Sequence, residues 1–211
     1  FGHTARRASL DYLARLNRFS QGATPAPTGI NAYRHLLAFA RSALDKFGAW
    51  LGRIDDAAVD FPDQAAFDAL LASGRGAILL GAHLGNLEMM RALAVGKQLV
   101  TVNAVVYTEH AQRFVGALAE TSENFRVNLL HVSHFGPDTA ILLRDKIDRG
   151  ELLVIVGDRT PPAENGRVVS ADFLGAPAPF PQGPYLLASL LECPVYLFFC
   201  VEEQGRYRVV F

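Results

Sequence analysis

Residues 77–88 read AILLGAHLGNLE, and their pattern is typical of one fold class. The first four residues form an uninterrupted aliphatic run that ends at a glycine, which is typical of a strand buried on both faces of a sheet. Further apolar runs of this kind lie at 99–106, 127–132, 152–156 and 195–201, and helical patterns lie between them at 87–95, 111–121, 139–149 and 184–191. Because strands alternate with helices, we predict an α/β fold with a mostly parallel central sheet flanked by helices.

The residues before this stretch have a helical period instead. The predicted elements are helices over 5–18, 31–51 and 64–73, with a linker rich in Gly, Pro and Thr over 21–29. In the second helix we expect the regularly spaced apolar residues, among them Leu37, Phe39 and Leu44, to be buried. We therefore expect one domain, with a helical cap over 1–62 and an α/β core over 63–211.

Composition excludes several classes of protein. The chain has 211 residues and a net charge of −1, so one domain is expected and no electrostatic field favours nucleic acid. Cys193 and Cys200 share one apolar run and indicate small buried side chains instead of a disulfide. No apolar run approaches the ~18–20 residues that a membrane-spanning helix needs. Because the chain begins with Phe1 and ends within a predicted strand over 206–211, we expect a fragment of a longer protein.

The polar part of residues 77–88 carries the chemistry. His83 follows a strand, and in open α/β sheets ligands gather at the carboxyl ends of strands. Asn86 is a candidate helix N-cap, which places Glu88 in the first turn of the next helix, where the chain can turn its carboxylate to the imidazole. Such a pair is a general base with an orienting partner, and a substrate hydroxyl would supply the nucleophile. The spacing alone favours a structural histidine and an ordinary first-turn acid.

Two sequence blocks resemble a known family. The segment from His83 to Glu88 resembles the His-x4-Asp/Glu motif of the lysophospholipid acyltransferase superfamily, and its neighbours are closest to the lipid A biosynthesis lauroyl and myristoyl acyltransferases. Residues 156–161, VGDRTP, resemble the Asp-containing strand end of that branch, and residues 172–178, DFLGAPA, are similar to its FxGxPA stretch. The blocks occur in the family's order between 78 and 201, although the Glu-Gly-Thr-Arg block of glycerol-phosphate members is absent.

The resemblance implies a glycerolipid acyltransferase-like fold and an enzyme that performs O-acyl transfer, with His83 and Glu88 as the catalytic residues. The acyl donor would be a thioester of acyl carrier protein or coenzyme A, and the acceptor a hydroxyl of a membrane lipid or glycolipid. Neither a cofactor nor a metal ion is expected. The resemblance places the protein at the cytoplasmic face of the inner membrane, either peripheral or anchored by segments outside this chain.

Seven residues are candidates for substrate binding. They are Asn86, Asp158, Arg159, Arg167, Phe180, Gln182 and Gly183. The Arg159 guanidinium suits an anionic substrate group, although an ion pair with Asp158 or Glu164 is an equal alternative. Phe180 is a candidate wall for an acyl tunnel or a packed loop residue. Backbone N–H groups around Gln182 and Gly183 are candidates for an oxyanion hole. All but Asn86 lie within 158–183, which we expect to be a long irregular loop.

Two other functions stay open at this level. The same His/Glu pair would serve a thioester hydrolase that uses water as nucleophile, and the fold would also serve a non-catalytic module that binds lipid or carrier protein. His131 and His134 have no third metal ligand nearby in the sequence, so a sheet-edge turn is favoured over a metal site. The arginines of residues 5–18 fit either a membrane-facing helix or a solvated helix face.

Overall fold

The computed structural model describes residues 2–50, 59–86, 100–106, 127–131, 136–160 and 167–211. At its centre lies a five-stranded sheet in the order β4-β3-β5-β2-β8, with every neighbouring pair parallel. The strands are β2 (Ala77–Gly81), β3 (Val102–Val106), β4 (Val127–His131), β5 (Leu152–Val156) and β8 (Val195–Leu197). The predicted α/β fold with a mostly parallel sheet is therefore confirmed. The helices predicted over 87–95 and 111–121 lie outside the described residues.

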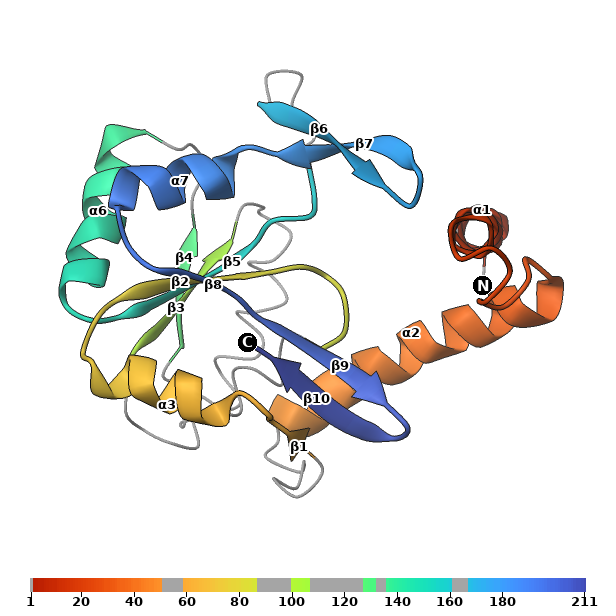
Figure 1. Ribbon diagram of the computed structural model, residues 1–211, viewed down its shortest axis with the longest axis horizontal. Coiled ribbons are helices and arrows are strands. Elements are labelled where there is room, and N and C mark those ends of the chain that lie inside the picture. Colours follow the sequence, from red (N-terminus) through yellow and green to blue (C-terminus); the bar gives the residue numbers. More distant parts are fainter. Residues whose placement is uncertain (1, 51–58, 87–99, 107–126, 132–135, 161–166) are drawn as a thin grey trace.

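Helices cover both faces of this sheet, which explains its continuous apolar strands (Figure 1). On one face α6 (Pro137–Asp148) and α7 (Gly183–Leu191) bury Leu143 and Leu187 against Ile78 and Leu80. On the other face lies α3 (Gln64–Ala72), the predicted third helix.

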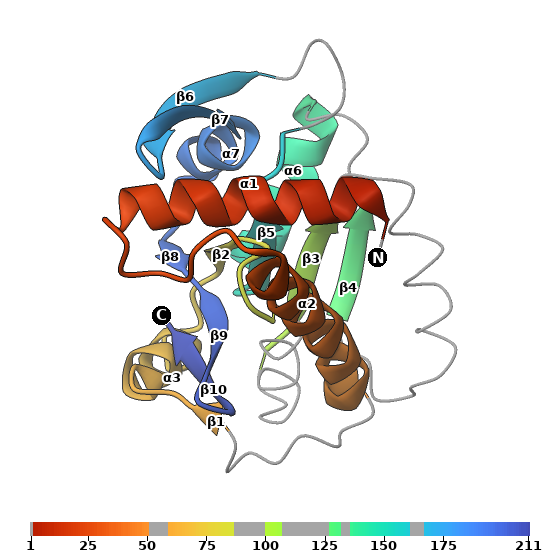
Figure 2. The ribbon, with the colours of Figure 1, turned by 90° about the vertical axis from the view of Figure 1, so that its right-hand side faces the viewer.

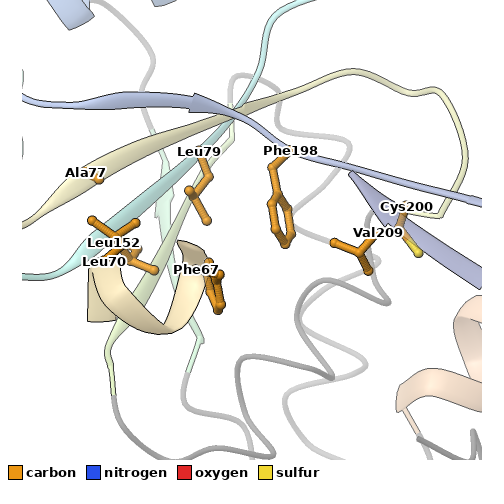
Figure 3. Packing of buried hydrophobic residues seen from close by; sticks show 8 residues of the cluster. All are labelled: Phe67, Leu70, Ala77, Leu79, Leu152, Phe198, Cys200 and Val209. Atoms are coloured by element: carbon orange, nitrogen blue, oxygen red, sulfur yellow. The ribbon is translucent and has the colours of Figure 1, made fainter. Parts of the chain in front are cut away.

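The core between α3 and the sheet contains the rings of Phe67 and Phe198 among smaller apolar side chains (Figure 3). Phe67 of α3 packs against Phe198, with ring centroids 5.7 Å apart, and Leu79 of β2 belongs to the same cluster. Alternate residues of β2 thus serve opposite cores, since successive side chains of a strand point to opposite faces.

The strand predicted over 195–201 is wrong as one element. Val195–Leu197 pairs with β2, whereas β9 (Phe199–Glu203) pairs with β10 (Arg206–Val210) in a three-stranded sheet completed by β1 (Val59–Asp60). The change of sheet occurs at Phe198, whose N–H still donates to Leu80 O at 3.0 Å. Both segments are largely apolar, so their hydropathy does not show the bend between them. The predicted terminal strand is confirmed as β10.

The loop predicted over 158–183 is also wrong in its second half. β6 (Val168–Phe173) and β7 (Ala176–Pro181) form an antiparallel hairpin that leads into α7. Prolines occupy alternate positions of β7, at 177, 179 and 181. A two-stranded hairpin tolerates them there, because alternate residues of a strand direct their backbone nitrogens away from the partner.

The two N-terminal helices pack against each other beside the α/β core (Figures 1 and 2). They are α1 (His3–Phe19) and α2 (Gly29–Trp50), which confirms both predicted helices. The expected burial of Leu37, Phe39 and Leu44 is wrong, since all three are exposed and Phe39 retains 73% of its surface. Among the described residues, no helix is both long enough and apolar enough to span a bilayer.

Candidate active site

The candidate site lies where two neighbouring strands of the central sheet end. β2 and β5 are paired along their full length, and the last partners are Gly81 and Val156. The register continues beyond the strands, because Gly157 N–H donates to Gly81 O at 2.9 Å. His83 and Asp158 each follow two positions after the last paired residues. Strand pairing therefore brings together side chains that lie 75 residues apart in the sequence.

Asp158 holds His83 through two hydrogen bonds. One carboxylate oxygen, Oδ1, lies 2.8 Å from the imidazole Nδ1, and the other, Oδ2, accepts the backbone N–H of His83 at 2.9 Å. The His83 side chain is 39% exposed and that of Asp158 30%. Partial burial raises the pKa of the Asp158 carboxyl, but the hydrogen bonds from His83 outweigh it and lower the pKa below its ordinary value. The carboxylate is therefore charged at neutral pH.

The loop that carries His83 is anchored to β9. Gly85 pairs with Cys200 in an isolated parallel bridge, and Asn86 N–H donates to Cys200 O at 2.7 Å. Gly85 has a φ of +76°, and a Cβ at this position would lie 1.9 Å from Cys200 O. Only glycine fits both the left-handed backbone and the close approach of β9.

Asn86, a predicted substrate-binding residue, is buried in this loop, with 2% of its surface exposed. Its side-chain amide lies near the hydroxyl of Tyr207 on β10, as does the carboxylate of Asp45 on α2. Burial and the Asp45 carboxylate raise the pKa of Tyr207, so its hydroxyl is neutral at physiological pH. Through its backbone N–H, Asn86 fixes the His83 loop to β9, and its burial leaves the side chain inaccessible to a substrate.

The start of α7 borders the same edge of the sheet. A Cβ on Gly157, the residue before Asp158, would lie 3.6 Å from Pro184 in the first turn of α7. Just before that turn, Gln182 N–H donates to Arg167 O at 2.9 Å, and Gln182 Nε2 donates to Val168 O at 3.0 Å. The backbone N–H and the side-chain amide of Gln182 therefore both join α7 to the hairpin. Because its backbone N–H already has an acceptor, this geometry does not support the predicted role of that N–H in an oxyanion hole.

The structure places the remaining predicted site residues as follows. Arg159 is exposed and forms no salt bridge with Asp158, whose carboxylate contacts His83; Glu164 lies outside the described residues. Arg167 is exposed at the start of the hairpin. Phe180 is half-buried on β7 and packs edge-to-face against Phe173. Gly183 is the first residue of α7.

Glu88, the predicted partner of His83, lies outside the described residues, as do residues 132–135 of the His131/His134 segment. Within the described part of the chain, no three His, Cys, Asp or Glu side chains group together in a way that would hold a metal ion. The contact between His83 and Asp158 did not follow from the sequence. In the sequence each of the two residues simply follows an apolar run. The sequence does not show that the two strands lie next to each other in the sheet.

An apolar groove runs between α6 and α7, with a volume of about 820 Å³. Its lining includes Gly136, Ile141, Gly183, Leu186 and Leu190. Gly183 lies next to Pro184, which approaches Gly157, so the groove begins close to the residue that precedes Asp158. The charged residues Arg144, Asp145 and Asp148 also line it, but the wall is mostly aliphatic, which is suited to a hydrocarbon chain.

The comparisons with known proteins agree with the sequence blocks. The model of the bacterial lipid A biosynthesis acyltransferase family matches residues 40–211, which include the His83 loop, Asp158 and the β6–β7 hairpin. No curated protein is similar enough to be counted as a relative. The match covers most of the chain and confirms the resemblance found in the sequence. The chain belongs to the bacterial lipid A biosynthesis acyltransferase family.

Proposed function

We propose that this acyltransferase moves a fatty acyl group from a thioester of acyl carrier protein or coenzyme A to a hydroxyl of a membrane lipid or glycolipid, with His83 as general base. The observation that carries the proposal is the exposed imidazole of His83 at the carboxyl edge of the sheet, with Nδ1 against a carboxylate. An Nδ1–H that donates to Asp158 leaves Nε2 as an unprotonated acceptor. A histidine in this state is suited to take a proton from a hydroxyl.

The proposed reaction has two steps. Nε2 of His83 takes the proton of the acceptor hydroxyl while the oxygen bonds to the thioester carbonyl carbon, giving a tetrahedral oxyanion. The carbon–sulfur bond then breaks, and the imidazolium returns its proton to the departing thiolate. The products are an ester and a free thiol, and the histidine is restored. Glu88, in the family's motif position, is proposed to stabilise the imidazolium.

We propose the groove between α6 and α7 as the binding site of the acyl chain. Its aliphatic lining and its beginning near Gly157 support this assignment. Burying methylene groups there would contribute about 0.8 kcal/mol for each CH₂. We expect Leu186→Glu, in the groove lining, to raise KM for a long-chain thioester more than for a short-chain one. Leu142→Glu, an exposed α6 residue outside the groove lining, is the control.

We propose that the protein works at the cytoplasmic face of the inner membrane and that α2 contacts the bilayer. Ile30, Leu37 and Leu44 lie on one side of α2 and are exposed, and the exposed Arg34 and Arg41 lie among them. Apolar residues that alternate with arginines suit an interface rich in anionic lipids.

The membrane contact is tested by sedimentation with vesicles that contain phosphatidylglycerol. Leu37→Glu is expected to reduce the bound fraction, whereas Leu142→Glu on α6 is expected to leave it unchanged. Equal binding of both variants would exclude the α2 contact.

The transfer reaction is tested by mass spectrometry of membrane lipids from cells that produce the wild type, His83→Ala or the control His3→Ala at equal abundance. We expect an acylated lipid that is lost only in His83→Ala, since loss of a general base costs on the order of 10²–10⁴ in rate. The mass of this lipid would identify both the chain and the acceptor. Identical lipid profiles would contradict the role of His83, and release of free fatty acid without a new ester would indicate a hydrolase.

A further inference from the structure

We propose that Asp158 is the positioning residue of His83: its carboxylate holds the imidazole as the Nδ1–H tautomer and directs Nε2 toward the acceptor hydroxyl. The inference rests on the proposed function of His83 as base. This positioning role takes the place of the substrate-binding role that the sequence suggested for Asp158. Asp158 would act on the reaction through His83 and would not itself contact the reacting atoms.

The geometry favours positioning because both oxygens of one carboxylate bind the same residue. Oδ1 lies 2.8 Å from Nδ1 of the ring, and Oδ2 accepts the backbone N–H at 2.9 Å. The first contact sets the direction of the ring and the second holds the backbone that carries it. Gly157 N–H donates a hydrogen bond to Gly81 O where the strands end, so the residue that carries the carboxylate follows directly on the paired sheet. Groups fixed on sheet strands are held more precisely than groups on free loops.

The chemistry of the carboxylate determines the tautomer. Both carboxylate oxygens are acceptors, so Nδ1 has to be the donor, and a neutral imidazole then has its lone pair on Nε2. An asparagine at 158 has one acceptor oxygen and one NH₂ group, which cannot satisfy both donors of His83. If the oxygen accepts the backbone N–H, the NH₂ group faces Nδ1 and favours the opposite tautomer, in which Nε2 carries the proton. That tautomer cannot accept a proton from the substrate.

This contact also limits what Glu88 can do. With Nδ1 of His83 as the donor, its single proton is engaged by Asp158, 2.8 Å away. Glu88 is therefore not needed to orient the ring through Nδ1, and its contribution is expected to be the negative charge that favours imidazolium. We accordingly expect Asp158→Asn to change the tautomer of His83, and Glu88→Gln to leave it unchanged.

The first test is NMR of the purified full chain with ¹⁵N-labelled histidine, in which His83 is assigned as the signal missing from His83→Ala among the six histidines. At pH 8 we expect the wild type to have a protonated Nδ1 and an unprotonated Nε2, with a shift toward protonated Nε2 in Asp158→Asn. Asp60→Asn, an exposed aspartate on β1, is the matched control and should resemble the wild type. A wild-type His83 that is protonated on Nε2, or a tautomer unchanged in Asp158→Asn, overturns the proposal.

The second test is steady-state kinetics of the same variants with an acyl thioester and a lipid acceptor. Asp158→Asn is expected to lower kcat about 10²-fold or more with little change in KM, as removal of a transition-state interaction does. Asp158→Glu, which retains the carboxylate, should recover part of the loss. A raised KM with wild-type kcat would return Asp158 to substrate binding and overturn the proposal. Because the NMR result does not depend on turnover, a wild type without transferase activity would refute the proposed function and leave the tautomer to be judged by itself.

Discussion

We expect even the methyl side chain of alanine at position 85 to lower the free energy of unfolding strongly. Gly85 lies two positions after His83, with a φ of +76°. A Cβ there would lie 1.9 Å from Cys200 O and 2.8 Å from Cys200 C. Both neighbours are backbone atoms of β9, which cannot rotate aside as a flexible side chain would. Gly85→Ala therefore has to separate the His83 loop from β9.

The cost has two parts. The left-handed backbone conformation costs alanine roughly 1–2 kcal/mol. In addition, real Cβ contacts are essentially never shorter than 3.0 Å, so the 1.9 Å approach has to open by 1.1 Å, the difference of the two. A shift of this size would lengthen the 2.7 Å hydrogen bond from Asn86 N–H to Cys200 O beyond bonding range. A buried donor left unsatisfied costs about 1–3 kcal/mol, so the expected total is roughly 2–5 kcal/mol.

The assay is urea-induced unfolding followed by circular dichroism, with Gly205→Ala as the matched control. Gly205 has a φ of +78° and nothing within 4 Å of an added Cβ, so it retains the backbone cost without the clash. We expect Gly85→Ala to lose about 1–3 kcal/mol more free energy of unfolding than Gly205→Ala. Equal losses in the two variants would show that β9 does not hold the loop at this distance. Acyl transfer should fall in Gly85→Ala even where the protein remains folded, because His83 moves with the loop.

Three further outcomes are expected. Phe198→Ala should lower the free energy of unfolding by about 3–5 kcal/mol in urea titrations, because Phe198 is fully buried among aromatic rings; a loss near zero would contradict its place in the core. Asp158 has a lowered pKa in the folded state, so its stabilisation should be complete above its unfolded pKa and be lost as pH falls through the folded one; the stability difference between wild type and Asp158→Asn should therefore shrink below about pH 4, and a constant difference would argue against the charged contact. Burial raises the pKa of the Cys200 thiol to about 12, so iodoacetamide at pH 8 should leave Cys200 unmodified until urea is added, and rapid labelling of the native protein would contradict its burial.

Local patterns predicted much of the fold because burial imposes them on each element separately. The runs at 77–80 and 152–156 are strands whose residues alternate between two cores, so nearly every position has to be apolar. Helical spacing likewise predicted α1, α3, α6 and α7 to within a few residues. The same reasoning failed in α2, where apolar residues at helical spacing are exposed. Periodicity shows that a helix has an apolar side, but it does not show what covers that side.

Hydropathy also failed where the chain changes partner without changing composition. Residues 195–201 are apolar throughout, yet they divide between two sheets at Phe198. The β6–β7 hairpin lacks a buried face, and prolines occupy alternate positions of β7. Its sequence therefore has no continuous apolar run that would predict a strand. In both segments the deciding information is which strand lies alongside, and this is a property of the assembled sheets.

The candidate site divides in the same way. Local sequence is sufficient to predict which chemical groups lie at the strand ends, an imidazole at 83 and a carboxylate at 158, because each follows its own apolar run. That these two strand ends are neighbours depends on the order of the strands in the folded sheet. The order β4-β3-β5-β2-β8 arises from how helices pack across both faces of the sheet, and no local period encodes it. Pairing of Gly81 with Val156 then brings His83 within 2.8 Å of Asp158, although 75 residues separate them along the chain.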